Sequence, residues 1–330
     1  CGLVAMPMSL EDWRLLGNQA IALTGFASLN VGLNFYNSYV LKPGDHVDLS
    51  LGPHFDFPVF YTLFHAIATC LGSTMIMCFN KPKTGFPNPK QFWEYKSGLL
   101  AIGALTAVNL ACNNASLTLV SLFLNQVIKA TGPMPTMVFS FSLEGKKYRL
   151  PMILTCGAIV GGTILAIPMK SGGPETSVAG VIVVIISMLA ASLKPVIMSL
   201  IFKGTAERPK LDPTPVLFYD FFVAFWLLLL YWLLNIQDER VESLEYMAYH
   251  PAVAVGILAA GATMAFFFNL CTYFTVKLTS ALTSTIASNG VKVLNIVISA
   301  IKDHLSDTRN WIGVALVCVS LCAYAYAGFQ

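Results

Sequence analysis

The sequence predicts an all-α membrane protein, with ten transmembrane helices arranged as two inverted five-helix repeats. Of its 330 residues, 56% are apolar and only 11% are charged, whereas a soluble domain carries about 25% charged residues. The apolar residues gather into ten segments close to the roughly 20 residues that span a bilayer. These segments divide near residue 170 into two sets of five, and an odd number per set inverts the second half relative to the first.

The ten predicted helices, in chain order, are 17–41, 57–79, 98–116, 118–142, 149–168, 176–201, 214–235, 252–273, 278–301 and 309–328. Turn-forming sequences separate several of them, at 42–45, 81–85, 171–174 and 212–215. Little chain is left for a separate soluble domain. We therefore expect one transmembrane domain over 1–330, with repeat halves at 17–168 and 176–328 and a binding site at the midplane between them.

The basic residues in the connecting segments predict the orientation. With both termini on one side, that side carries twelve basic residues: Arg14, Lys81, Lys83, Lys90, Lys96, Lys146, Lys147, Arg149, Lys203, Arg208, Lys210 and Lys277. The other side carries five: Lys42, Lys170, Arg240, Lys302 and Arg309. Because positive loops stay in the cytosol, we expect both termini to be cytosolic.

Lys129 lies in the middle of the fourth apolar segment, preceded by Asn125 and Gln126 and followed by Pro133. A lysine at that depth costs about 2.5–3.5 kcal/mol on insertion scales and normally faces a bundle interior or a wet cavity. On a helix, the two amides share its face, and the proline predicts a kink just beyond it. We interpret this stretch as half of an anion-binding site.

Lys292 repeats this pattern in the ninth segment, the fourth of the second half. Ser288 and Asn289 come one turn before it, and Asn295 comes one turn after. Two such lysines are suitable partners for a phosphate or pyrophosphate group. The alternative is that each lysine extends to a membrane interface or caps a backbone carbonyl.

The third intramembrane lysine is Lys194, close to the cytosolic end of the sixth segment. Asp220, the only acid inside a predicted helix, lies at a similar depth, so the two are predicted to form an ion pair that acts as a gate or a brace. Tyr219 beside it either stacks on a nucleobase or belongs to an interfacial aromatic belt. Tyr273, just before a run of hydroxyl residues at 279–285, is a further candidate for contacting a polar substrate.

Other functional classes find little support. The eight cysteines and five histidines are dispersed, so neither a metal site nor a disulfide framework is predicted. A net charge of +3 gives no reason to expect nucleic acid. No nucleophile–base pair, catalytic carboxylate pair or phosphate-binding glycine loop is visible, so we expect neither an enzyme nor a cofactor. The pair Gly157-x-x-x-Gly161 suits internal helix packing or a homodimer.

Six stretches of the sequence form a recognisable series: 29–37 (LNVGLNFYN), 57–65 (FPVFYTLFH), 113–117 (NNASL), 125–130 (NQVIKA), 279–283 (TSALT) and 289–292 (NGVK). Together they resemble the triose-phosphate and nucleotide-sugar translocators of the drug/metabolite transporter superfamily. Each stretch alone is loosely specified, but their order and spacing are fairly specific. The resemblance extends over about 17–328, which is nearly the whole chain.

The resemblance implies ten helices, an inverted repeat and exchange of an organic phosphate for another phosphate compound. It assigns phosphate binding to Lys129 and Lys292. In plastid members an arginine follows the second lysine, whereas this chain has Val293; likewise Ser38 replaces a common lysine, and Gly132 a common glutamate. These departures and the 279–285 run are more similar to nucleotide-sugar carriers. Tyr219 and Asp220 partly match a nucleobase-reading Tyr-Asn motif in that group.

We therefore expect an antiporter that exchanges a nucleotide sugar, or a related organic phosphate, for a nucleoside monophosphate or phosphate across a Golgi or endoplasmic reticulum membrane. Its binding residues would be Lys129, Lys292, Asn125, Gln126, Asn289, Tyr273 and Tyr219. Three alternatives stay open: a sugar-phosphate/phosphate translocator of the plastid envelope, a drug or small-metabolite exporter of the same superfamily, and a membrane-embedded enzyme acting on a lipid phosphate. The chain begins at Cys1 and not at a methionine, so a targeting segment ahead of it also stays open.

Overall fold

A computed structural model describes residues 10–41, 55–79, 89–166, 177–203, 211–234, 239–278, 281–302 and 307–329, and these ranges form twelve α-helices. In chain order the helices are α1 (Leu10–Leu41), α2 (Pro58–Phe79), α3 (Pro89–Leu119), α4 (Leu122–Ala130), α5 (Pro133–Glu144), α6 (Leu150–Ala166), α7 (Val178–Lys203), α8 (Pro213–Leu234), α9 (Glu239–Tyr249), α10 (Pro251–Leu278), α11 (Ala281–Lys302) and α12 (Thr308–Phe329). The predicted all-helical class is confirmed over the described residues. Nine of the ten predicted segments each coincide with one of these helices.

The remaining segment, 118–142, is two helices rather than one kinked helix. The chain leaves α4 at Thr131 and re-enters a helix at Pro133, so Thr131 and Gly132 separate α4 from α5. Proline has no N–H to continue the α4 hydrogen-bond ladder, and its fixed φ suits the first position of a new helix. Glycine ahead of it adds to the break because it is a poor helix former. Thr131 and Gly132 keep right-handed helical backbone angles, so the predicted kink is a two-residue break in the hydrogen-bond pattern of the helix.

The short helix α9 was not predicted. It carries Glu239 and Glu242 in its first turn and buries Ser243 and Tyr246. Its sequence is too polar to stand out as an apolar segment, and apolar segments are the pattern that marks the other helices. Glu239 also caps α2, because its Oε1 accepts hydrogen bonds from the backbone N–H groups of Val59 at 2.7 Å and Phe60 at 2.8 Å. A carboxylate at a helix N-terminus is favoured by the free N–H groups and the helix dipole.

Five helices within the described residues are long and apolar enough to cross a membrane: Pro58–Phe79, Phe92–Leu119, Val178–Phe202, Pro213–Leu234 and Pro251–Thr275. Shorter apolar stretches occupy Leu150–Ala166, Gly290–Ile301 and Thr308–Tyr324. Large apolar side chains such as Phe79, Val178 and Val319 are exposed on the outside of the bundle. Such a surface suits lipid rather than water.

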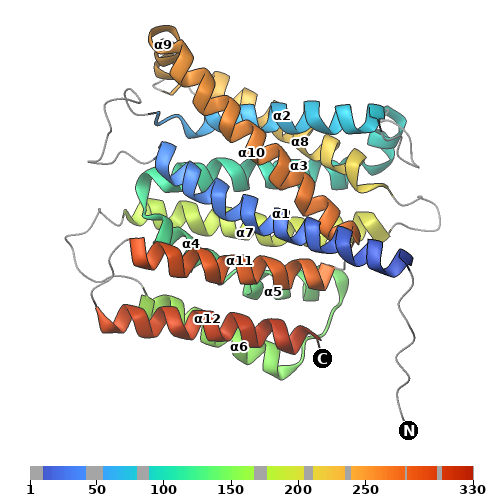
Figure 1. The fold of residues 1–330 in the computed structure, drawn as a ribbon, viewed down its shortest axis with the longest axis vertical. Coiled ribbons are helices and arrows are strands. Elements are labelled where there is room, and N and C mark those ends of the chain that lie inside the picture. Colours follow the sequence, from blue (N-terminus) through green and yellow to red (C-terminus); the bar gives the residue numbers. More distant parts are fainter. Residues whose placement is uncertain are drawn as a thin grey trace.

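Most helices run side by side in one stacked bundle (Figure 1). Helix α6 packs against α12 at one end of the stack, and α2 packs against α8 toward the other. Between them, α3 contacts α7, α1 contacts α10, and α11 contacts α4. The first turns of α1 and the last turns of α12 lie on the same side of the bundle, the right-hand side in Figure 1. The interrupted pair α4–α5 is thereby surrounded by α3, α6, α7 and α11.

Candidate functional site

The interruption between α4 and α5 places Lys129 in the last turn of a helix inside the bundle. Thr131 closes α4, with its N–H donating to Ile128 O at 3.0 Å, and Gly132 N–H donates to Lys129 O at 3.1 Å. A cation near a helix C-terminus is stabilised by the negative end of the helix dipole. Interrupted helices at membrane depth are a common way to build binding sites in transporters, since the freed backbone groups line the site.

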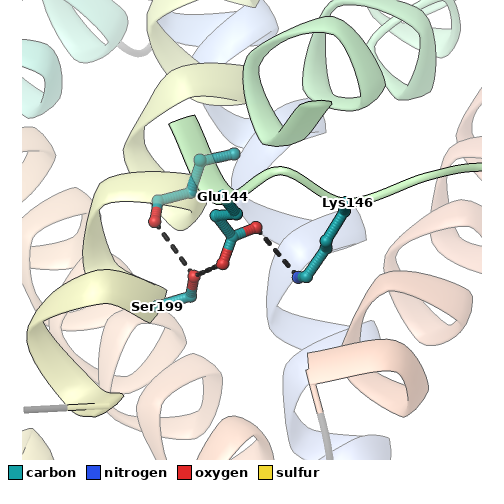
Figure 2. A network of polar contacts seen from close by, with 4 residues as sticks. Glu144, Lys146 and Ser199 are labelled. Carbon is teal, nitrogen blue, oxygen red and sulfur yellow. Dashed lines mark hydrogen bonds and ion pairs between the residues drawn. The ribbon is translucent and has the colours of Figure 1, made fainter. Parts of the chain in front are cut away.

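The start of α5 is held against α7 by Ser192, whose Oγ donates to Gly132 O at 3.2 Å. The far end of α5 is held by the same helix, as Figure 2 shows. There Ser199 Oγ donates to Glu144 Oε1, and Lys146 Nζ forms an ion pair with Glu144 Oε2 at 2.9 Å. The Glu144 side chain is 1% exposed. Helix α5 is therefore attached to α7 at both of its ends.

Lys129 is half-buried and donates a short hydrogen bond to Asn113 Oδ1 on α3. Asn113 belongs to one of the stretches that carry the family resemblance, but it is not among the predicted binding residues. Sequence alone does not single it out, because its adjacency to Lys129 depends on how α3 and α4 cross. Its Nδ2 donates to Asn114 Oδ1 at 3.2 Å, which orients the Asn113 oxygen toward the lysine.

Lys292 on α11 lies at the same interruption. Its Nζ is 3.7 Å from the position that a Cβ on Gly132 would occupy. It is also close enough to Lys129 for their charges to repel. Both predicted lysines thus lie near the α4–α5 junction, although they are 163 positions apart in the sequence. Neither is in an ion pair within the described part of the chain.

The amides around Lys129 form a connected network. Asn125 is fully buried and donates from Nδ2 to Ser116 Oγ at 2.6 Å. Gln126 donates to Asn34 Oδ1 on α1 at 3.4 Å and to Asn125 Oδ1 at 3.4 Å. These contacts connect α4 to α1 and α3, so both predicted amides lie beside Lys129 but bond to protein groups in this conformation.

Two asparagines flank Lys292 on α11, and the structure describes the side chain of only one of them, Asn295. Asn295, one turn later on α11, is 1% exposed, and neither its Nδ2 nor its Oδ1 has a hydrogen-bond partner among the described residues. A buried amide without a partner costs about 1–3 kcal/mol, which makes it a candidate for contacting a bound ligand. The backbone of Asn289 lies in α11, but its side chain is outside the described part.

Lys194 and Asp220 form an ion pair with 2.5 Å between Nζ and Oδ2. Asp220 is fully buried, and Tyr273 on α10 donates its hydroxyl to the same oxygen at 3.0 Å. Three helices, α7, α8 and α10, therefore meet at one carboxylate. Tyr273 was predicted to contact substrate alongside Lys129, but here it belongs to this second cluster.

Tyr219 is 4% exposed and lies among aromatic rings. Its ring centroid is 5.7 Å from that of Phe92 and 5.8 Å from that of Phe218. In this conformation the ring packs inside the bundle. Neither an interfacial belt position nor an open stacking surface describes it.

The described residues hold no group of three or more His, Cys, Asp or Glu side chains placed to bind a metal ion. This arrangement places two ammonium groups at an interrupted helix, with amides and a serine around them. Paired cations of this kind suit a compact anion such as phosphate.

Comparison with known proteins bears directly on this site. A model described as the UAA transporter family matches residues 59–328. The chain belongs to the UAA transporter family. It is accordingly a multi-pass membrane transporter and not an enzyme. The match includes α3, α4, α7 and α11, which supply the lysine junction.

Relatives of this UAA family member are known in Arabidopsis thaliana. A probable sugar phosphate/phosphate translocator is 28% identical over 273 residues, covering 82% of this chain and 70% of the relative. UDP-uronic acid transporter 1 is 27% identical, covering 82% of each chain. The predicted resemblance to triose-phosphate and nucleotide-sugar translocators is thereby confirmed.

The fold is also seen in a solved structure. A crystal structure superimposes with a TM-score of 0.51 at 13% identity, covering 94% of this chain and 96% of the other. The likeness extends over nearly the full length of both chains, so the helix arrangement of this UAA family member has been observed in another protein.

Proposed function

We propose that the protein exchanges a nucleotide sugar, or a related organic phosphate, for a nucleoside monophosphate or phosphate across an endomembrane. The observation that carries this proposal is the position of Lys129 in the last turn of α4 and of Lys292 Nζ beside Gly132, both at the α4–α5 interruption. Two ammonium groups without an acidic partner among the described residues match the two negative charges of a diphosphate. The names of the Arabidopsis relatives, one a UDP-uronic acid transporter, support the same substrate class.

The proposed binding residues follow from position. Lys129 and Lys292 bind phosphate oxygens, while Asn125, Gln126, Asn289 and Asn295 orient the polar part of the substrate. Tyr219 reads a nucleobase only in a conformation that opens the aromatic cluster around it. Lys194, Asp220 and Tyr273 act as a brace or gate between α7, α8 and α10.

The helix contacts support an inverted repeat of ten spans, with α4 and α5 counted as one span and α9 outside the membrane. The counterparts would be α1 and α7, α2 and α8, α3 and α10, α4–α5 and α11, and α6 and α12. Exchanging counterparts converts the α1–α10 contact into α7–α3, and the α2–α10 contact into α8–α3; all four contacts occur. The contacts α2–α8, α4–α11 and α6–α12 convert into themselves and also occur.

This symmetry gives a mechanism. The two lysines are counterparts, one from each half, so the substrate would sit on the pseudo-symmetry axis. Rocking of one half against the other then opens the site to each side in turn. Exchange is favoured over one-way transport because two ammonium groups without an acidic partner in a low-dielectric site are costly, which slows the empty carrier.

We propose a Golgi or endoplasmic reticulum membrane with both termini cytosolic. The count of basic residues supports this orientation. The shared position of the α1 start and the α12 end on one side of the bundle agrees with it (Figure 1). A homodimer stays a prediction.

A sugar-phosphate/phosphate translocator is the second candidate, favoured by the name of another Arabidopsis relative. The residue after Lys292 argues against it. Val293 packs against an apolar cluster that includes Ile296 and Val317, so the second half supplies one cation at this point and not two.

Exchange in liposomes tests the proposal. Purified protein is reconstituted into vesicles preloaded with UMP, GMP or inorganic phosphate, and uptake of radiolabelled UDP-glucuronic acid, GDP-mannose and triose phosphate is measured. We expect nucleotide-sugar uptake driven by a nucleoside monophosphate. Uptake of triose phosphate driven only by phosphate would establish the second candidate, and no exchange of any pair would refute both.

A further inference from the structure

The three intramembrane lysines differ in what holds their ammonium groups. Lys194 is held by the carboxylate of Asp220 at 2.5 Å. Lys129 is held by a neutral amide oxygen, that of Asn113. Lys292 has no such bond to a described residue. Its Nζ lies close to the Gly132 position. One protein therefore contains a lysine with a full counter-charge and another with a weaker, uncharged acceptor.

A hydrogen bond from its side-chain nitrogen fixes the orientation of Asn113. Its Nδ2 donates to Asn114 Oδ1 at 3.2 Å. Asn114 is 1% exposed and donates in turn to Thr62 Oγ1 on α2 at 2.8 Å. The same Asn114 oxygen accepts from Asn37 Nδ2 on α1 at 3.3 Å. Because the amide nitrogen is engaged in this network, the Asn113 oxygen is left directed at Lys129.

An amide and a carboxylate differ greatly as partners of a buried ammonium group. In a low-dielectric site a carboxylate neutralises the charge and is expensive to displace. An amide oxygen contributes one charge-assisted hydrogen bond, which an arriving phosphate can replace with a stronger one. The empty site is thus partly satisfied, yet it stays available to an anion.

We propose that Asn113 is the placeholder acceptor of Lys129, a positioning residue that sets how strictly transport is coupled to exchange. The inference rests on the proposed exchange of organic phosphates. In the empty carrier Asn113 holds the ammonium group and permits slow crossing without substrate. In the loaded carrier the phosphate takes the ammonium group, and the Asn113–Asn114 network keeps the side chain in place for the next cycle.

Two substitutions at this position have opposite expected effects. Asn113→Asp gives Lys129 a full counter-charge, as Lys194 has, so uptake into vesicles without internal substrate should rise relative to exchange. The substrate concentration for half-maximal exchange should rise about tenfold or more, because a carboxylate must then be displaced. Asn113→Leu removes the acceptor, so uptake into empty vesicles should fall relative to exchange.

The measured quantity is the ratio of uptake into empty vesicles to uptake into preloaded ones, with the best substrate pair found for the wild type. Loss of folding lowers both uptakes together and leaves this ratio unchanged, whereas the proposed role moves it. Asn109→Asp is the matched control, one turn earlier on α3, where Asn109 Oδ1 accepts from Ser187 Oγ at 2.9 Å instead of from a lysine. Its ratio should equal that of the wild type.

Opposite shifts for Asp and Leu at 113, with no shift for Asn109→Asp, support the proposal. An unchanged ratio in both 113 variants while the wild type exchanges substrate would overturn this inference and leave the proposed function intact. A shift of equal size in Asn109→Asp would also overturn it, because any added charge on α3 would then suffice. A wild type that exchanges no pair would overturn the proposed function and this inference with it.

Discussion

Lys292 and Gly132 lie against each other at the α4–α5 interruption, with 3.7 Å between the lysine Nζ and the position of an added Cβ on the glycine. Ser192 Oγ is 3.6 Å from that same position, and Lys129 O is 3.1 Å from it. The absence of a side chain at Gly132 thus lets the backbone of the junction pack closely beside an ammonium group in the interior of the bundle. In the proposed mechanism the substrate phosphate binds at this junction.

Gly132→Glu should therefore weaken nucleotide-sugar exchange. The carboxylate would lie within reach of Lys292 and would compete with the substrate phosphate for it. We expect the affinity for the nucleotide sugar to fall at least about tenfold, the scale of one charge-assisted hydrogen bond. Liposome exchange, together with the shift in unfolding temperature on adding the best transported substrate, measures the loss.

Gly157→Ala is the control for that variant, because nothing lies within 4 Å of an added Cβ on Gly157. Alanine at this exposed helical position should leave exchange unchanged and raise stability by at most about 1 kcal/mol. If Gly132→Glu transported as well as Gly157→Ala, the junction beside Lys292 would have no role in binding.

Lys129→Ala and Lys292→Ala should each abolish exchange while the protein still folds. Removing either lysine relieves charge repulsion with the other, so unfolding temperatures without substrate should not fall. Stabilisation by organic phosphates should be lost in both. Normal exchange by the Lys129→Ala protein in liposomes would remove the central assignment.

Lys194 should behave differently from these two lysines. Removing one partner of a buried ion pair leaves an uncompensated charge and costs about 3–5 kcal/mol, so Lys194→Met and Asp220→Leu should each unfold at markedly lower temperature. The double variant leaves neither charge and should recover most of that loss. Thermal unfolding of the three proteins in detergent measures this coupling.

A double variant as unstable as the sum of its two singles would show that the pair does not couple. Tyr273 provides a further check, since its hydroxyl also donates to Asp220 Oδ2. Tyr273→Phe in the Asp220→Leu background should therefore add little further loss.

The positions of the apolar helices were predictable because each spans a run of consecutive apolar residues, and the predicted ends fall within a few residues of α2, α7 and α8. The break at Gly132 was predicted only as a kink, since sequence indicates that Pro133 ends a hydrogen-bond ladder but not whether the helix resumes in line. Helix α9 was missed because its polar composition resembles a loop.

The candidate site was predictable in its charges but not in its partners. Lys129 and Lys292 stand out because lysine is costly inside a membrane, and their shared position in each half suggested that they meet. The Asn113 contact with Lys129, and the placement of Tyr273 at Asp220, depend on how α3 and α10 cross their neighbours. Helical periodicity gives the face of a helix but not which neighbour that face contacts.

Glu239 offers a last test, outside the membrane-spanning helices. Because it caps α2 through Val59 and Phe60 N–H, Glu239→Ala should lower the free energy of unfolding by about 1–2 kcal/mol. Glu239→Gln retains an acceptor oxygen and should cost less. Thermal unfolding of both variants at neutral pH separates the loss of the cap from the loss of the charge.

The pH dependence of wild-type stability, relative to that of Glu239→Gln, follows from the environment of the Glu239 carboxyl group. Burial raises the pKa of Glu239 above its ordinary value of 4.5, and the nearby Asp56 and Glu242 add to the rise, while the Val59 and Phe60 N–H groups oppose it. A carboxyl group whose pKa is higher in the folded chain than in the unfolded chain stabilises the fold at pH values below its unfolded-state pKa. This stabilisation is lost as pH rises through its folded-state pKa. Relative to Glu239→Gln, the wild type should therefore lose stability as pH rises from below 4.5. A wild-type curve parallel to that of Glu239→Gln across this range would show that the Glu239 carboxyl group has the same pKa in the folded and unfolded chain.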